Sequence, residues 1–132
     1  MKQHFFAVAI VSTLFALTGV QAMTQGEYTV AKARIGSDYR LAQSRCDTLK
    51  DNARDVCLTE AKGAADVAMA ELEQHYKPSP ANARKVAAVK AAAAFEVTRE
   101  ACDTLAGEAH QACVHQAEDN HAKAKADVDV SG

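Results

Sequence analysis

Apolar residues recur at intervals of three and four along most of the chain, which is the spacing that lines one face of an α-helix. Four such stretches follow the first part of the chain, at about 24–50, 53–76, 81–105 and 108–127. The sequence contains no convincing run of β-branched residues that alternates apolar and polar positions, as a half-buried strand would. The pattern therefore predicts an all-α fold of about four helices.

Helix boundaries are marked most clearly at two places. Thr24 and Glu27 match a capping box, in which each side chain satisfies an exposed amide of the first turn. The segment Lys77-Pro78-Ser79-Pro80 is expected to end the second helix and start the third. Proline disfavours helix in the residue before it, and Ser79 can cap a helix whose first residue is Pro80.

A cysteine motif occurs twice in the chain. The motif Cys-Asp-Thr-Leu begins at Cys46 and again at Cys102, and a second cysteine follows each copy at the same spacing, as Cys57 and Cys113. The two copies are 56 residues apart, and positions with this offset are called matching positions below. Other matching positions also keep similar residues, among them Tyr39 with Phe95, Ala61 with Ala117 and Leu72 with Val128. These matches predict a single helical domain, 23–132, made of two repeats, 23–77 and 81–132, joined by a linker at 77–80.

The chain begins with the features of a secretory signal peptide, residues 1–22. A basic start at Lys2 precedes an apolar run from Phe5 to Leu17, and a small-residue cleavage signal ends at Ala22. The apolar run is too short to span a bilayer of about 30 Å comfortably. We expect cleavage after Ala22, no membrane span in the mature chain, and a periplasmic or secreted location.

The charge of the chain argues against nucleic acid as a partner. The formal net charge is −2 and becomes about −3 once the signal peptide, with its positive Lys2, is removed. Nucleic-acid binding depends on clustered Lys and Arg residues that neutralise phosphates. The chain is rich in alanine and has no tryptophan, so its helices form easily but bury little apolar area.

The four cysteines bear on the choice between two helical architectures. An even number of cysteines at repeated spacing in an exported protein is typical of a disulfide framework. On one straight helix Cys46 and Cys57 would lie about 16 Å apart, whereas the Cα atoms of a disulfide lie within about 7 Å. They can pair only if the chain reverses near Lys50-Asp51-Asn52. Asp51 or Asn52 could then cap the helix that follows.

We favour two helical hairpins, in which Cys46 pairs with Cys57 and Cys102 pairs with Cys113. A unit that was duplicated together with both its cysteines is most easily understood if it already closed its own bond. Gly107 also lies at the expected bend of the second repeat, where a glycine commonly ends the outgoing helix.

Two other pairings stay open from the sequence. One long antiparallel hairpin folded at Pro78-Ser79-Pro80 would bring Cys57 opposite Cys102 and Cys46 opposite Cys113. Pairing Cys46 with Cys102 and Cys57 with Cys113 would instead suit parallel helices, which a short turn disfavours.

Candidate chemistry beyond the cysteines is sparse. His110 and His115 are weak candidates for metal ligands, because a separation of five residues places them on different faces of a helix. Asp47 and Asp103 follow the first cysteine of each copy, where carboxylates are typically caps or surface charges. The sequence has no phosphate loop, nucleophile elbow or His-Glu metalloprotease motif. We therefore expect no catalytic residues, no cofactor and no enzymatic activity.

The chain resembles a family of small exported proteins of Gram-negative bacteria. The resemblance is carried by the repeated Cys-Asp-x-Leu motif with its second cysteine, Asn52-Ala53-Arg54-Asp55-Val56-Cys57, Glu60-Ala61-Lys62 and the Lys77-Pro78 linker. Those proteins are helical, rich in alanine and lysine, and sometimes labelled Tol-type cell-envelope proteins. The resemblance covers most of the mature chain and departs at Glu108-Ala109-His110-Gln111. It implies a periplasmic location and supplies no catalytic residue.

Two classes of function fit these features. The first is a non-catalytic periplasmic helical protein that acts as an interaction, envelope-associated or stress-related factor through an unknown protein partner or envelope component. The second is a periplasmic protein that binds a small ligand or a metal in a groove between stapled helices. Thin helices often gain buried area by association, so a homodimer is a further expectation.

Overall fold

The structure is a computed structural model that describes residues 22–130. Its four helices are α1 (Gln25–Cys46), α2 (Asp51–Tyr76), α3 (Pro80–Cys102) and α4 (Gly107–Val130). The prediction of an all-α fold is confirmed. Apart from Ala22, the predicted signal peptide, 1–22, lies outside the described residues.

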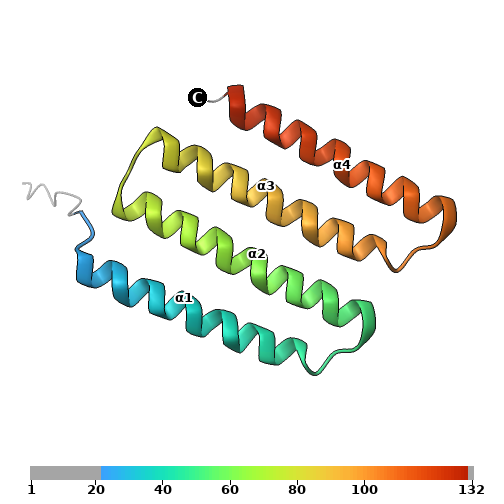
Figure 1. Cartoon of the computed structure of the whole chain (residues 1–132), viewed down its shortest axis with the longest axis horizontal. Coiled ribbons are helices and arrows are strands. Elements are labelled where there is room, and N and C mark those ends of the chain that lie inside the picture. The colour runs from blue at the N-terminus through green and yellow to red at the C-terminus, as the bar shows by residue number, and fades with distance from the viewer. Residues whose placement is uncertain (1–21, 131–132) are drawn as a thin grey trace, which may run out of the picture.

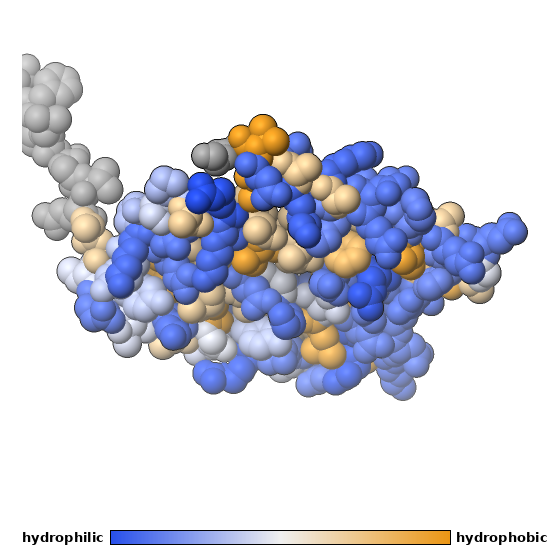
Figure 2. All heavy atoms as spheres, turned by 45° about the horizontal axis from the view of Figure 1, so that its top comes forward, coloured by the Kyte–Doolittle hydropathy of each residue, from blue (hydrophilic) through white to orange (hydrophobic). Residues whose placement is uncertain are grey.

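The helices lie side by side in a single layer, each antiparallel to the next (Figure 1). Within the described range, helices pack only on their neighbours in the chain, α1 on α2, α2 on α3 and α3 on α4, and the contact between α2 and α3 is the most extensive. Most domains pack two or more layers around a core. In the described part of this chain no second layer covers the first, so both broad faces are open. Figure 2 shows apolar side chains scattered among hydrophilic ones.

Two disulfides join the helices in pairs, and each pair forms a hairpin. Cys46 is bonded to Cys57 with their Cα atoms 5.5 Å apart, and Cys102 is bonded to Cys113 with their Cα atoms 5.7 Å apart. The chain therefore reverses between the cysteines of each copy, as the favoured architecture requires. The segment Pro78-Ser79-Pro80 only connects the hairpins, so the alternative of one long hairpin is wrong.

The predicted helix starts at Thr24 and Ser79 are confirmed. Thr24 and Glu27 form the capping box, and the Ser79 hydroxyl accepts a hydrogen bond from the amide of Asn82 at 3.0 Å, with Pro80 as the first helical residue. The outgoing helices are shorter than predicted. α1 ends at Cys46 rather than near Lys50, because the chain already turns there and the Leu49 amide bonds the Cys46 carbonyl at 2.9 Å.

The turn into each second helix depends on one residue with a positive φ angle. Asp51 has φ 53° and the matching Gly107 has φ 59°. The prediction that Gly107 ends the outgoing helix is wrong, since α3 ends at Cys102 and Gly107 begins α4. The prediction that Asp51 or Asn52 caps α2 is also wrong, because both lie inside that helix and its N-cap, Lys50, makes no side-chain cap bond. The left-handed region favours glycine, and aspartate is among the few other residues that enter it readily.

The core of the described chain is thin. Its buried apolar residues are Cys46, Ala61, Ala70, Leu72, Cys102 and Ala117. Small residues also let α2 and α3 approach closely, since a Cβ atom added at Gly63 would lie 3.0 Å from the Cβ atom of Ala93. The stability of the fold therefore depends on the disulfides and on close helix contact rather than on large buried side chains.

Candidate functional site

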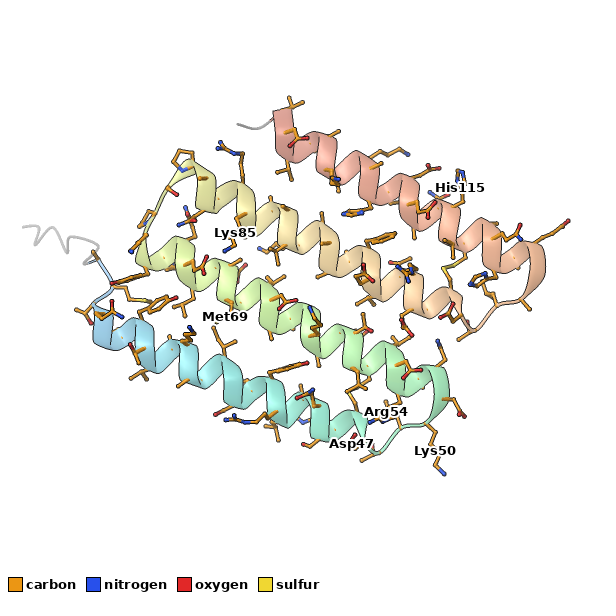
Figure 3. The ribbon with its side chains drawn as sticks, viewed as in Figure 1. Asp47, Lys50, Arg54, Met69, Lys85 and His115 are labelled. Atoms are coloured by element: carbon orange, nitrogen blue, oxygen red, sulfur yellow. A yellow bond between two sulfur atoms is a disulfide. The ribbon has the colours of Figure 1, made fainter. Side chains whose placement is uncertain are left out.

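An extensive hollow lies across α1, α2 and α3 on one face of the layer. It has a larger opening of about 830 Å³ and a smaller one of about 410 Å³, which meet at Tyr39, Lys62, Asp66 and Met69. We call the two openings together the groove. Its apolar lining comes from Ile35, Tyr39, Leu58, Ala65, Met69, Ala70, Val89, Ala92 and Ala93. Met69 of α2 and Lys85 of α3 are labelled in Figure 3.

The helical spacing of α2 builds the floor of the groove. Leu58, Lys62, Asp66, Met69 and Glu73 are three or four residues apart, so they follow one another along one face of the helix. At a rise of about 1.5 Å per residue, this row runs for roughly 22 Å. The groove is therefore long enough to receive about four turns of another helix.

Four charged side chains of the groove form two ion pairs, and Lys32 and Glu96 add one further charge of each sign. Lys62 Nζ lies 2.6 Å from Asp66 Oδ2, and Lys85 Nζ of α3 lies 2.6 Å from Glu73 Oε2 of α2. The hydrogen bond to Asp66 raises the pKa of Lys62, so its ammonium stays charged at physiological pH. The balanced charges give the groove no strong preference for an acidic or a basic ligand.

The second hairpin does not repeat the smaller opening. His121 of α4 stacks on Phe95 of α3 with ring centroids 4.6 Å apart and an interplanar angle of 14°. The positions that match them are Ala65 and Tyr39, so in the first hairpin a methyl group stands where the second has an imidazole. Lys62 and Met69 are likewise replaced, by Glu118 and Lys125. A hollow of about 180 Å³ lies beside Phe95 and His121.

The two elbows share an interaction that the sequence analysis did not identify. Asp47 Oδ1 lies 3.0 Å from an Arg54 guanidinium nitrogen (Figure 3). Asp103 Oδ1 lies 3.0 Å from Nε2 of His110, which is at the position that matches Arg54. Thr48 and Thr104 each donate a hydroxyl hydrogen bond to a carbonyl of the preceding helical turn. The signal was present in the sequence as an acid and a base seven residues apart in both copies. These aspartates therefore bridge the elbow.

The histidines proposed as weak metal ligands do not come together. His110 contacts Asp103 at the elbow, whereas His115 Nδ1 lies 3.3 Å from Asp119 Oδ2 one turn along α4. The described residues contain no cluster of three or more histidine, cysteine, aspartate or glutamate side chains that could hold a metal ion. All four cysteines are consumed in disulfides.

The sequence suggests a groove between stapled helices as one possible binding site but does not identify its residues. Lys62, Asp66 and Met69 lie on α2, whose buried residues include Ala61 and Leu72, and the groove-lining row lies beside that buried stripe. The available signal was the pair Lys62 and Asp66, four residues apart, beside the apolar Met69.

None of the helices in the described range is both long and apolar enough to cross a membrane. Comparison of the chain with protein-family models, with curated proteins and with solved structures gives no match.

Proposed function

We propose that this chain is a non-catalytic periplasmic interaction protein of the cell envelope, and that it holds an apolar segment of a protein partner in the groove. The observation that carries the proposal is the apolar groove itself, whose smaller opening in the first hairpin is narrowed by the ring of His121 at the matching place in the second. Grooves of this kind receive the apolar face of an amphipathic helix.

The balanced charges support an apolar occupant. Lys62 is paired with Asp66 and Lys85 with Glu73, and an uncharged helix face would not break either ion pair. The apolar side chains between these pairs, above all Met69, would supply the contact area. Methionine adapts its shape to different apolar surfaces, which suits a site that accepts more than one sequence.

Export supports the periplasmic part of the proposal. Residues 1–22 have the pattern of a cleavable signal peptide, and two disulfides are typical of proteins from oxidising compartments. N-terminal sequencing of the protein recovered from the periplasmic fraction should begin at Met23. Recovery of uncleaved protein from the cytoplasm would contradict this assignment.

The groove is tested with a synthetic amphipathic helix that carries leucines on one face and balanced charges elsewhere. We expect the labelled peptide to bind the mature protein in fluorescence anisotropy. Ala65→His, which introduces the side chain of the second hairpin, and Met69→Lys should each weaken binding by about tenfold or more. His115→Ala is the matched control, because His115 is exposed and outside the groove. Absence of binding, or equal binding by all variants, would refute the proposal.

A small amphiphilic ligand is the second candidate, favoured by the size of the larger opening. Its volume of about 830 Å³ lies within the range of small-molecule sites, about 300–1,000 Å³. A ligand of the native state must raise the melting temperature by mass action. Thermal unfolding in the presence of fatty acids and aromatic amphiphiles should show such a rise, and Met69→Lys should abolish it, if this candidate is correct.

A further inference from the structure

The outer edge of α1 has the character of a packing surface, although α1 contacts only α2 in the described chain. Val30 and Leu41 are 71% and 52% exposed on this edge, and the small residues Ala33 and Ser37 lie between them. The matching residues of Val30, Ser37 and Leu41 in α3 are Val86, Ala93 and Val97. Ala93 packs against α2, and the two valines are half-buried. The edge of α1 thus matches the side of α3 that binds a helix.

The layer cannot continue by placing α1 of one copy on α4 of another in the same manner as α3 packs on α2. That contact depends on Gly63, where an added Cβ atom would lie 3.0 Å from Ala93 Cβ. The position in α4 that matches Gly63 is Asp119. A carboxylate side chain therefore occupies the place where the second helix would have to approach, and head-to-tail growth is blocked at α4.

The charges beside the apolar edge of α1 are instead self-complementary, so that the stripe of one copy matches the same stripe of a second copy. Glu27, Arg34, Asp38 and Arg45 are spaced by seven, four and seven residues, so they form one stripe along the flank of α1. When two copies of α1 lie antiparallel about a two-fold axis near Gly36, Glu27 stands opposite Arg45 of the other copy and Arg34 opposite Asp38. Val30 then stands opposite Leu41. Arg34 and Asp38 form an ion pair with each other at 4.0 Å within one copy, and their side chains are 83% and 70% exposed, so a second copy can reach both.

We propose that a second copy of this chain docks on the outer edge of α1, antiparallel and two-fold symmetric, through Val30, Leu41 and the charged stripe. A two-fold axis normal to the layer keeps the charged stripes of the two copies on the same face of the layer. Because α1 lies at one edge of the layer, a second copy docked there would extend the layer (Figure 1). The surface is separate from the groove and does not depend on the proposed function. One helix pair buries less than the roughly 1,200 Å² of a stable interface, so the dimer dissociates readily and weakens as salt rises.

Sedimentation velocity of the mature, disulfide-bonded protein tests the proposal. Between about 10 μM and about 1 mM at low salt, the average mass should rise from one copy towards two. Val30→Lys and Leu41→Lys should each weaken association by about tenfold or more. Val130→Lys should not, because Val130 is 88% exposed but lies on α4. Circular dichroism confirms that each variant remains helical.

A charge exchange separates this register from other contacts. Asp38→Arg places like charges opposite each other twice in the dimer and should weaken it by about fivefold. Adding Arg34→Asp restores opposite signs and should recover most of the loss. A protein that stays monomeric throughout would overturn the proposal. So would a dimer that Val30→Lys leaves intact, failure of the exchange to recover association, or open-ended polymers.

Discussion

In the first hairpin the seam between α1 and α2 is open around Tyr39, whereas in the second hairpin the matching Phe95 is covered by the ring of His121. The two elbows, by contrast, are alike. Each has a disulfide, a residue with positive φ and an aspartate that contacts a basic side chain seven residues later. The elbow is therefore a shared structural requirement. The open seam is special to the first hairpin, which is where a function is to be sought.

Removing one disulfide at a time is expected to have the largest effect. Each bond closes a loop of about a dozen residues, so its loss should lower the free energy of unfolding by about 3 kcal/mol. Cys102→Ser with Cys113→Ser should expose the amides of α4, and Cys46→Ser with Cys57→Ser those of α1, because each outer helix packs on one neighbour only. Urea unfolding and hydrogen exchange measure both effects.

The two variants should also differ from each other. Far from its elbow, α1 is held to α2 by the stacked rings of Tyr28 and Tyr76, with centroids 4.5 Å apart. At the matching positions the second hairpin has Arg84 and the terminal Gly132. Loss of protection should therefore reach further along α4 than along α1. Equal protection in the two variants would contradict this difference.

Gly63→Asp gives α2 the residue that α4 has at the matching position, Asp119. Gly63 lies where α2 contacts α3. The added side chain meets Ala93, so we expect a loss of about 2 kcal/mol or more in the free energy of unfolding. Gly36→Ala is the matched control, since an added Cβ atom there meets nothing within 4 Å. It should raise stability slightly through helix propensity. Thermal unfolding that ranks the two variants equally would show that the close approach is unimportant.

Exchanging the residues with positive φ tests whether the elbows are equivalent. Gly107→Ala should cost about 1–2 kcal/mol, because alanine is strained at φ 59°. Asp51→Gly should gain up to about 1 kcal/mol at φ 53°, where glycine has no such strain. Changes of the same sign in urea unfolding would refute the equivalence.

His121→Ala should open the second hairpin in the way that Ala65 leaves the first open. Loss of the ring stack with Phe95 should lower the free energy of unfolding by about 1 kcal/mol. The same variant should increase binding of an apolar fluorescent dye, whereas Ala65→His should decrease it. Unchanged dye binding in both variants would mean that these positions do not control access.

The smallest effect concerns the start of α1. Hydrogen bonds from Thr24 lower the pKa of Glu27 below its usual value of 4.5. The capping box is therefore fully present above about pH 4.5, and its contribution is lost as the pH falls through the lower pKa of the folded state. Glu27→Gln should remove this dependence, measured as amide protection of the first turn. The start of α3 is the internal comparison, because Ser79 caps it without a carboxylate.

Sequence patterns predicted the four helices and the two helix starts because these depend on neighbours in the chain. Thr24 with Glu27 and Ser79 with Pro80 satisfy backbone groups within one turn. The ends of α1 and α3 were predicted too late, and the role of Gly107 was wrong. The apolar spacing continues through Leu49 and Leu105, although the backbone has already turned.

The tertiary structure alone decided the single layer, the groove and the free edge of α1. Apolar stripes show that a helix packs, but which helix it packs on depends on how closely two backbones approach, as at Gly63 and Ala93. The groove needs Tyr39, Met69 and Val89 from three helices, and no pattern within one helix specifies that meeting. Capping hydrogen bonds join residues that are close in the sequence, whereas a surface shared by several helices exists only once those helices are packed.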